Sequence, residues 1–250
     1  MTTVTTVKEF NRYGETLENI LLLRTSPVAV KMLEKEADIP DGAVRPKKDR
    51  GYHLAQCQAF AVSRREGTIV AMLKEDHWCP AALMAYGMVP VPEQRGPVKS
   101  HPYDRFEYGK YIGIVTAPLK TANFKPDVVI IYSNTSQLRS LLLALPFDEI
   151  PLVNGRFFPP SCGHAVVTPM LKGGYWVVLP DPGEYQRALG DEGEMMFAVP
   201  AAKMPGLFAG LQRFQDQGFA YRNHNYLMLG DFPQPDFYKQ MFKEWGLEDY

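Results

Sequence analysis

A set of short, continuous apolar runs constrains the fold more than any other feature of the sequence, and residues 127–132 form the clearest of them. This run is rich in β-branched side chains and bounded by polar residues, which is typical of a buried strand. Similar runs at residues 28–33, 68–73, 111–116, 175–179 and 195–199 predict further strands, and residues 7–24, 52–65, 79–86, 137–145, 165–172 and 201–214 predict helices. The alternation predicts an α/β chain with a mixed sheet flanked by helices; an α+β arrangement is the open alternative.

The chain has 250 residues, of which 46% are hydrophobic and 22% charged, so it is long enough to bury a substantial core. We find no linker that separates two domains, and we therefore predict a single domain over residues 1–250. Residues 225–250 are expected to form a peripheral C-terminal segment. Aromatic residues within 237–245 predict a helix there that docks on the body or on a second copy, so we expect a homo-oligomer.

The formal net charge of -1 gives no reason to expect nucleic acid or an anionic membrane as a partner. No apolar run approaches the ~20 residues that a membrane helix needs. The first residues lack the basic start and apolar core of a secretory signal. Three cysteines are too few for a disulfide framework. These observations predict a cytoplasmic protein with reduced or metal-bound thiols that acts on a small molecule.

Cys79 lies where an expected strand meets an expected helix. Pro80 suits the first turn of a helix, because its missing N–H would have no partner there. Cys79 is then the N-cap, where backbone N–H groups and the helix dipole favour a thiolate. The alternative is a small buried cysteine that packs as a hydrophobic residue.

Cys57, Cys79 and Cys162 share two properties as a set. Each has small residues beside it, which leaves room for a bulky group near the backbone, and each has a histidine nearby, namely His53, His77 and His164 respectively. No pair has the C-x-x-C spacing of zinc fingers or ferredoxins. Four readings remain open: a zinc site, an iron–sulfur cluster held by three thiolates, a nucleophilic cysteine, or no chemistry at all.

Other polar residues are weaker candidates. Asp181, Glu184, Arg187 and Glu194 precede or border an expected strand, and any of them is a candidate general acid or base, although a surface charge is the more common role. Tyr132, Ser133 and Asn134 follow the clearest strand, where a polar turn often binds a ligand in α/β proteins. A helix cap by Ser133 or Asn134 is the competing interpretation.

Several segments resemble the family called domain of unknown function 169. They are Ser26-Pro27-Val28-Ala29-Val30, the Cys57 helix, Cys79-Pro80-Ala81-Ala82-Leu83 with Gly87, Ser161-Cys162-Gly163 and Glu194-Met195-Met196-Phe197-Ala198-Val199-Pro200. The resemblance runs from about residue 15 to about residue 215, and the order of the motifs carries it rather than any single motif. It implies a cytoplasmic prokaryotic protein and favours a shared cluster site, but it identifies no reaction.

The sequence therefore leads to the hypothesis that Cys57, Cys79 and Cys162 bind one [4Fe-4S] cluster with one iron left open. Such an iron suits a lyase or a sulfur-removing enzyme that works without net redox change. His77 and His164 are the predicted acid or base, and His77 is alternatively the fourth ligand. The competing hypotheses are a ligand- or redox-sensing protein and an enzyme that depends on zinc or on a thiol.

Overall fold

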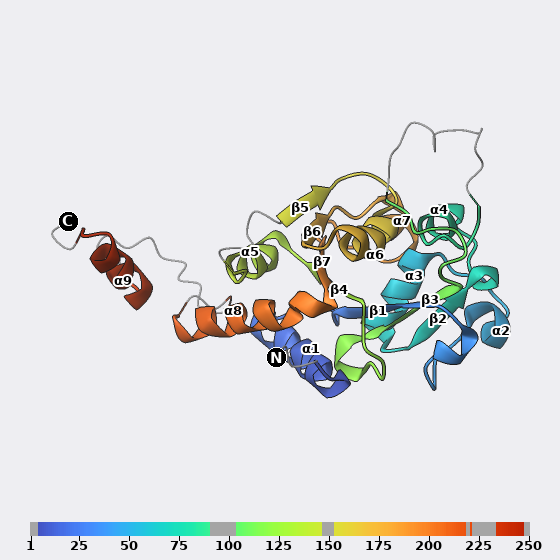
Figure 1. Cartoon of the computed structure of the whole chain (residues 1–250), viewed down its shortest axis with the longest axis horizontal. Helices are drawn as coiled ribbons and strands as arrows, with labels where there is room; N and C mark the ends of the chain where they lie inside the picture. Colours follow the sequence, from blue (N-terminus) through green and yellow to red (C-terminus); the bar gives the residue numbers. More distant parts are fainter. Residues whose placement is uncertain (1–4, 91–103, 147–152, 219–220, 222–233, 248–250) are drawn as a thin grey trace.

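The computed structural model describes residues 5–90, 104–146, 153–218, 221 and 234–247. Their strands form one seven-stranded sheet in the order β2-β3-β1-β4-β7-β6-β5 (Figure 1). The strands are β1 (Val28–Leu33), β2 (Val70–Leu73), β3 (Gly113–Pro118), β4 (Val128–Ser133), β5 (Val153–Arg156), β6 (Tyr175–Val178) and β7 (Met195–Pro200). Only the β5–β6 pair is parallel among these, so the sheet is mixed.

The helices lie on both faces of the sheet. They are α1 (Val7–Leu21), α2 (Pro46–Arg50), α3 (Gln56–Ala61), α4 (Pro80–Ala85), α5 (Thr135–Leu143), α6 (Ser161–Lys172), α7 (Pro182–Arg187), α8 (Met204–Asp216) and α9 (Asp236–Glu244). A π-helical turn, Val62–Glu66, extends α3. The chain is thus a single mixed α/β domain, as the apolar runs predict.

Two separate cores account for the continuous apolar runs. Along β4, Val128 and Ile130 pack with α3, α4 and α6 in one core, while Val129 and Ile131 pack with α1, α5 and α8 in the other. Neighbouring strand residues point to opposite faces, so a strand covered on both sides must be apolar at every position. We call the side with α3, α4, α6 and α7 the pocket face and the side with α1, α5 and α8 the opposite face.

The predicted strands and helices match the structure closely, but three short elements, α2, α7 and β5, were missed. Residues 34–50 were expected to be a loop, and they contain α2. The turn expected at residues 180–183 begins α7, whose first residue is Pro182. Strand β5 has the sequence Val-Asn-Gly-Arg and shows no strand pattern.

The C-terminal aromatic segment includes α9, which lies apart from the sheet beyond α8 (Figure 1). None of its residues is buried. Part of the expected peripheral segment, residues 225–233 and 248–250, lies outside the described residues. Docking on a second copy therefore stays a prediction.

Candidate functional site: a pocket lined by all three cysteines

The starts of four helices on the pocket face converge on one cavity of about 280 Å³, which we call the cysteine pocket. Its wall includes the N-cap residue of each helix: Ala55 for α3, Cys79 for α4, Pro160 for α6 and Asp181 for α7. The complete lining is Ala55, Gln56, Cys57, Cys79, Ala81, Pro159, Pro160, Cys162, Asp181, Pro182, Gly183, Gln186 and Arg187. Cysteines that are far apart in the sequence therefore share one pocket.

Glycine and small residues allow these helices to approach closely. A Cβ atom on Gly163 would lie only 3.0 Å from Cβ of Ala85, so Gly163 lets α6 pack tightly on α4. Gly87 follows α4 with φ +68°, and a Cβ there would meet the Glu107 carbonyl oxygen at 2.5 Å. A side chain at Gly87 would thus be excluded by both backbone conformation and space. These glycines fix the arrangement that brings Cys79 and Cys162 to one pocket.

Asp181 joins two walls of the pocket. Its Oδ1 accepts a hydrogen bond from the Gly183 N–H at 2.8 Å, and its Oδ2 accepts one from the Ser161 N–H at 2.9 Å. The carboxylate therefore caps α7 and holds the start of α6 at the same time. This geometry gives Asp181 a structural role that does not depend on acid–base chemistry.

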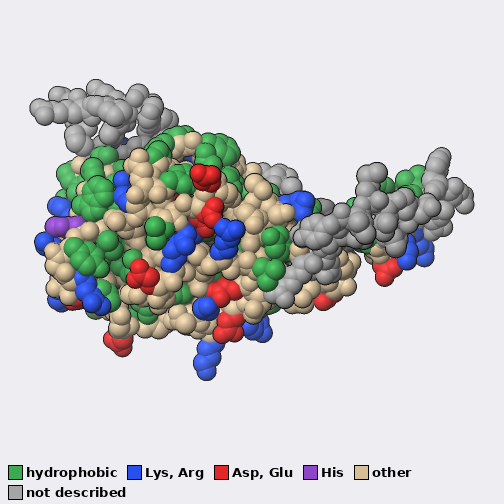
Figure 2. Space-filling view, turned by 180° about the vertical axis from the view of Figure 1, so that it is seen from behind, with side chains coloured by type: hydrophobic (Ala, Val, Ile, Leu, Met, Phe, Trp, Pro, Cys, Tyr) green, Lys and Arg blue, Asp and Glu red, His purple; other side chains and the backbone are tan. Residues whose placement is uncertain are grey.

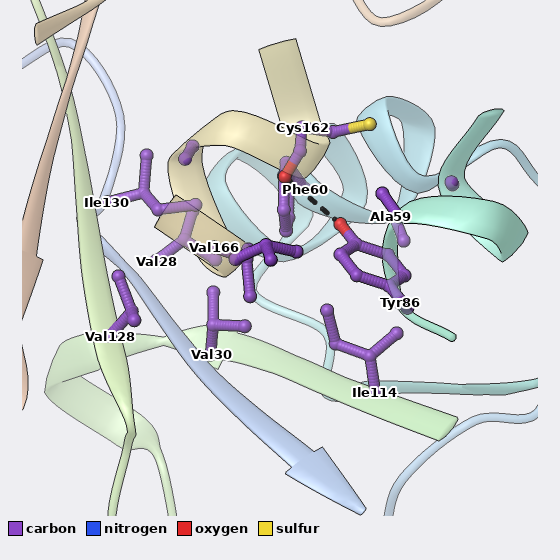
Figure 3. Packing of buried hydrophobic residues seen from close by; sticks show 14 of the residues in the cluster. Val28, Val30, Ala59, Phe60, Tyr86, Ile114, Val128, Ile130, Cys162 and Val166 are labelled. Atoms are coloured by element: carbon purple, nitrogen blue, oxygen red, sulfur yellow. Dashed lines mark hydrogen bonds between the residues drawn. The ribbon is translucent and has the colours of Figure 1, made fainter. Parts of the chain in front are cut away.

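Cys57 and Cys162 are buried free thiols, whereas the free thiol of Cys79 is only half-buried. Cys57 Sγ lies 3.8 Å from the Gly183 carbonyl oxygen and accepts a hydrogen bond from Arg187 Nε at 3.4 Å. Cys162 lies in the first turn of α6, and its sulfur points away from Val28, Val30 and Ile130 of the sheet (Figure 3). The Tyr86 hydroxyl donates to the Cys162 carbonyl oxygen at 3.1 Å and ties α6 to the end of α4.

Burial disfavours the thiolate at two of these cysteines. Desolvation, and secondarily the charge of Glu184, raises the pKa of Cys57 to about 11. Desolvation, followed by the proximity of Cys57, raises the pKa of Cys162 well above its ordinary value. Free thiols of this kind are poor nucleophiles at neutral pH, while a bound metal deprotonates its thiol ligands outright. The raised pKa values therefore argue against free thiolate nucleophiles at these two residues, and a metal that bound them would have to displace both protons.

Neither predicted catalytic histidine lines the cysteine pocket. His77 is buried, its ring centroid lies 6.4 Å from that of Tyr86, and burial lowers its pKa to about 4. His164 is buried on α6 against Phe158, with ring centroids 4.9 Å apart, and burial followed by the Arg156 charge lowers its pKa to about 4. Both imidazoles are neutral at physiological pH, and a catalytic or ligand role for either stays a prediction.

A buried charged network lies behind the α7 wall. Arg64 forms two hydrogen bonds with Glu194, at 2.7 and 3.0 Å, and its guanidinium carbon lies 3.8 Å from the centroid of the Tyr132 ring. The Tyr132 hydroxyl donates to both carboxylate oxygens of Glu184, at 3.1 and 3.2 Å. Burial raises the pKa of Glu184 to about 8. Neither Glu184 nor Glu194 is among the lining residues of the pocket.

The polar turn after β4 serves as a helix cap. Asn134 is the N-cap of α5: its side chain accepts from the Gln137 N–H at 2.8 Å, and the Gln137 side chain accepts from the Asn134 N–H at the same distance. This reciprocal pair is a capping box. The capping interpretation of Asn134 is confirmed.

Sequence reasoning missed Gln56 in the pocket wall. Gln56 is 1% exposed, and neither polar atom of its side-chain amide has a hydrogen-bond partner among the described residues. Nothing in the run Ala55-Gln56-Cys57-Gln58 distinguishes this glutamine from the next one. The one signal in the sequence that could have identified Gln56 is its position next to Cys57.

Fold and site together define a class: a single-domain α/β protein whose helix starts surround a pocket lined by three free cysteines. Residues 16–210 match the model of the family called domain of unknown function 169, described as "Uncharacterised ArCR". The match covers most of the chain, so the chain belongs to this family. No curated protein and no solved structure gives a significant match.

Two features are absent from the part of the chain that the structure describes. Within the described residues, no three His, Cys, Asp or Glu side chains stand close enough together to bind a single metal ion. No helix in the described part of the chain is long and apolar enough to cross a membrane. Charged side chains of both signs are interspersed on the face that Figure 2 shows.

Proposed function

We propose that Cys57, Cys79 and Cys162 bind one [4Fe-4S] cluster in the cysteine pocket and leave one iron open to a small-molecule substrate. The observation that carries this proposal is the convergence of all three cysteines of the chain on a single pocket. A cluster spreads its thiolate ligands over about 6–7 Å, whereas a tetrahedral zinc site holds them within about 4 Å of one another. The distances between the three sulfurs therefore distinguish a cluster from zinc.

The surroundings of the cysteines suit an anionic group. Arg187 already donates a hydrogen bond to Cys57 Sγ, and such bonds stabilise thiolate ligands. Gly183 forms part of the wall, and its lack of a side chain leaves room there for the Arg187 guanidinium. The partial exposure of Cys79 leaves one side of the pocket accessible to a substrate.

The proposed reaction class is non-redox elimination or sulfur removal. An iron with an exchangeable position supplies a Lewis acid toward oxygen or sulfur of a small molecule. In dehydration, water leaves as a carbon–carbon double bond forms; in hydrolytic sulfur removal, oxygen from water replaces sulfur, which leaves as hydrogen sulfide. Both reactions balance without an added oxidant or reductant. The chain's own part is to hold the substrate and exclude competing water.

Anaerobic reconstitution tests the proposal. Reduced protein is incubated with ferrous iron and sulfide, desalted and analysed; we expect about four irons and four sulfides per chain and broad absorbance near ~400 nm. Serine at position 57, 79 or 162 should abolish this absorbance, whereas Ala209→Ser, an exposed change on α8, should not. Stoichiometric zinc in a colourless protein, or full iron content in any of the cysteine variants, would contradict the proposal.

A further inference from the structure

We propose that the cysteine pocket contains a carboxylate-binding subsite formed by Arg187 and Gln56, so that its substrate is a small carboxylic acid. This inference deepens the proposed function by naming the substrate class and rests on it to that extent. The subsite itself consists of residues that are in place without a cluster. Two independent observations lead to it, one on α7 and one on α3.

The first observation is a cation without a carboxylate partner. Arg187 lines the pocket and forms no ion pair with any described residue. Its guanidinium carbon lies 4.9 Å from the centroid of the half-exposed Trp78 ring, and its Nε donates to Cys57 Sγ. These two contacts fix the plane of the guanidinium and leave its terminal N–H groups for another acceptor. A planar fork of this kind matches a carboxylate with two parallel hydrogen bonds.

Gly183 helps to hold this orientation. A Cβ atom at position 183 would lie 2.4 Å from Nη2 of Arg187, so only glycine allows the guanidinium to fold against the α7 backbone. Asp181 is the one carboxylate in the described wall, and its two oxygens already accept the N–H groups of Gly183 and Ser161. The Asp181 charge acts on Arg187 without forming an ion pair, so the terminal N–H groups of Arg187 stay available to an incoming anion.

The second observation is the buried amide of Gln56. Its side-chain nitrogen and oxygen are both without a hydrogen-bond partner among the described residues, although the residue is 1% exposed. Buried polar groups in folded proteins are nearly always paired, and an exception in a pocket wall points to a bound group. The amide offers a donor and an acceptor that lie beneath the pocket surface, and a turn of its side chain would present them to a second carboxylate oxygen together with a hydroxyl or thiol on the adjacent carbon.

Binding to metal-free, reduced, full-length protein tests the subsite apart from the cluster. The probes are lactate, 2-mercaptopropionate and propane-1,2-diol, titrated to about 20 mM and followed by saturation-transfer NMR. We expect both acids to bind with millimolar Kd and the uncharged diol to bind at least about tenfold more weakly.

Variants separate recognition from folding. Arg187→Gln should weaken binding of the acids at least about tenfold, and Arg187→Lys should weaken it less, because lysine keeps the charge but loses the fork. Gln56→Leu should weaken lactate binding severalfold while thermal stability stays the same or rises, which a structural glutamine would not allow. Arg139→Gln on the surface of α5 is the matched control and should bind the acids normally.

Three results would overturn the subsite: acids that bind no better than the diol, an Arg187→Gln variant that binds like the wild type, or no binding of either acid over the whole titration. Failure here leaves the reconstituted absorbance of the cysteine site unchanged. Failure of the cluster proposal, in turn, leaves binding to the metal-free protein unchanged, so the two outcomes are distinguishable.

Discussion

Two buried glutamines show how the two faces of the sheet differ. On the opposite face, Gln137 of α5 donates to the carbonyl oxygens of Leu21 and Leu22 at 3.0 and 3.1 Å, and its side-chain oxygen accepts from the Asn134 N–H. On the pocket face, Gln56 of α3 is equally buried, and its amide has no partner among the described residues. The first glutamine stabilises the fold, whereas the second is the one that we propose binds a ligand.

The helix starts repeat this contrast. On the opposite face, α1 begins with a capping box between Thr6 and Glu9, and α5 begins with one between Asn134 and Gln137. On the pocket face, α3, α4 and α6 begin at Ala55, Cys79 and Pro160, whose side chains form no capping hydrogen bond. Violations of local stability rules concentrate where function requires them. The contrast holds for α3, α4 and α6 against α1 and α5, whereas α7 on the pocket face is capped by Asp181 and α8 on the opposite face begins at Lys203 without a side-chain cap. We propose that the uncapped helix starts of the pocket face serve ligand binding.

The largest effect is expected from matched substitutions of the two glutamines. Gln137→Leu removes the donor to two carbonyl groups and should lower the free energy of unfolding by about 3 kcal/mol. Gln56→Leu removes no hydrogen bond within the described structure and should change the free energy of unfolding by less than about 1 kcal/mol, or raise it. Urea unfolding of both variants measures the difference, and equal losses would remove the distinction between the faces.

The pH dependence of Glu184 gives a second, smaller effect on the pocket face. Its pKa of about 8 in the folded protein lies above the ordinary value of 4.5, so the folded state holds this proton more tightly than the unfolded state. Its stabilising contribution is therefore complete below pH 4.5 and is lost as pH rises through 8. Glu184→Gln should gain stability relative to wild type as pH rises from 5 to 8, by at most about 1.4 kcal/mol for each pH unit.

Urea unfolding of both proteins at each pH checks this prediction. His77 and His164, with pKa values lowered to about 4, act in the opposite direction, since their contribution is lost as pH falls from 6.5 toward 4. Because they are present in both proteins, their effect cancels in the difference. A difference that stays constant from pH 5 to pH 8 would show that Glu184 is not protonated in the folded protein.

A still smaller effect is expected from Gly163→Ala. The added methyl group would lie 3.0 Å from Cβ of Ala85 and 3.1 Å from the Pro160 ring, so α6 must move away from α4 by a few tenths of an ångström. We expect a loss of about 1 kcal/mol in the free energy of unfolding and weaker iron retention. Gly206→Ala on α8 is the matched control, because a Cβ there would lie 3.7 Å from the nearest heavy atom. This variant should retain iron normally.

The sequence predicted the layers of this fold well because strands β1, β4 and β7 are buried on both faces and are almost entirely apolar, with Lys31 of β1 as an interruption. It failed at α7, where Pro182 and Gly183 are typical of a turn, although Pro182 is the first residue of the helix. Because α7 was not predicted, the part of the pocket wall that α7 forms was not predicted either. Short elements are found from sequence when they are apolar, as β2 and β6 are, whereas α7 is short and polar and carries no periodicity that distinguishes it from a loop.

For the site, the sequence singled out the three cysteines because each stands among small residues. The two histidines were chosen because they are neighbours of cysteines in the sequence. Proximity in sequence does not determine which way a side chain points in the folded chain. Residues two apart on a helix point about 200° apart, so His164 and Cys162 on α6 face different surroundings. Gln56 and Arg187 enter the pocket through packing between distant segments, which local sequence does not encode.

Mössbauer spectroscopy of protein reconstituted with ⁵⁷Fe tests the central claim most directly. A cluster held by Cys57, Cys79 and Cys162 has three thiolate-bound irons and one iron of different ligation, so we predict two subsites in a ratio of about three to one. Addition of 2-mercaptopropionate should shift the minor subsite alone. A spectrum without a four-iron species, or one whose four irons are equivalent and do not respond to the acid, would contradict the account.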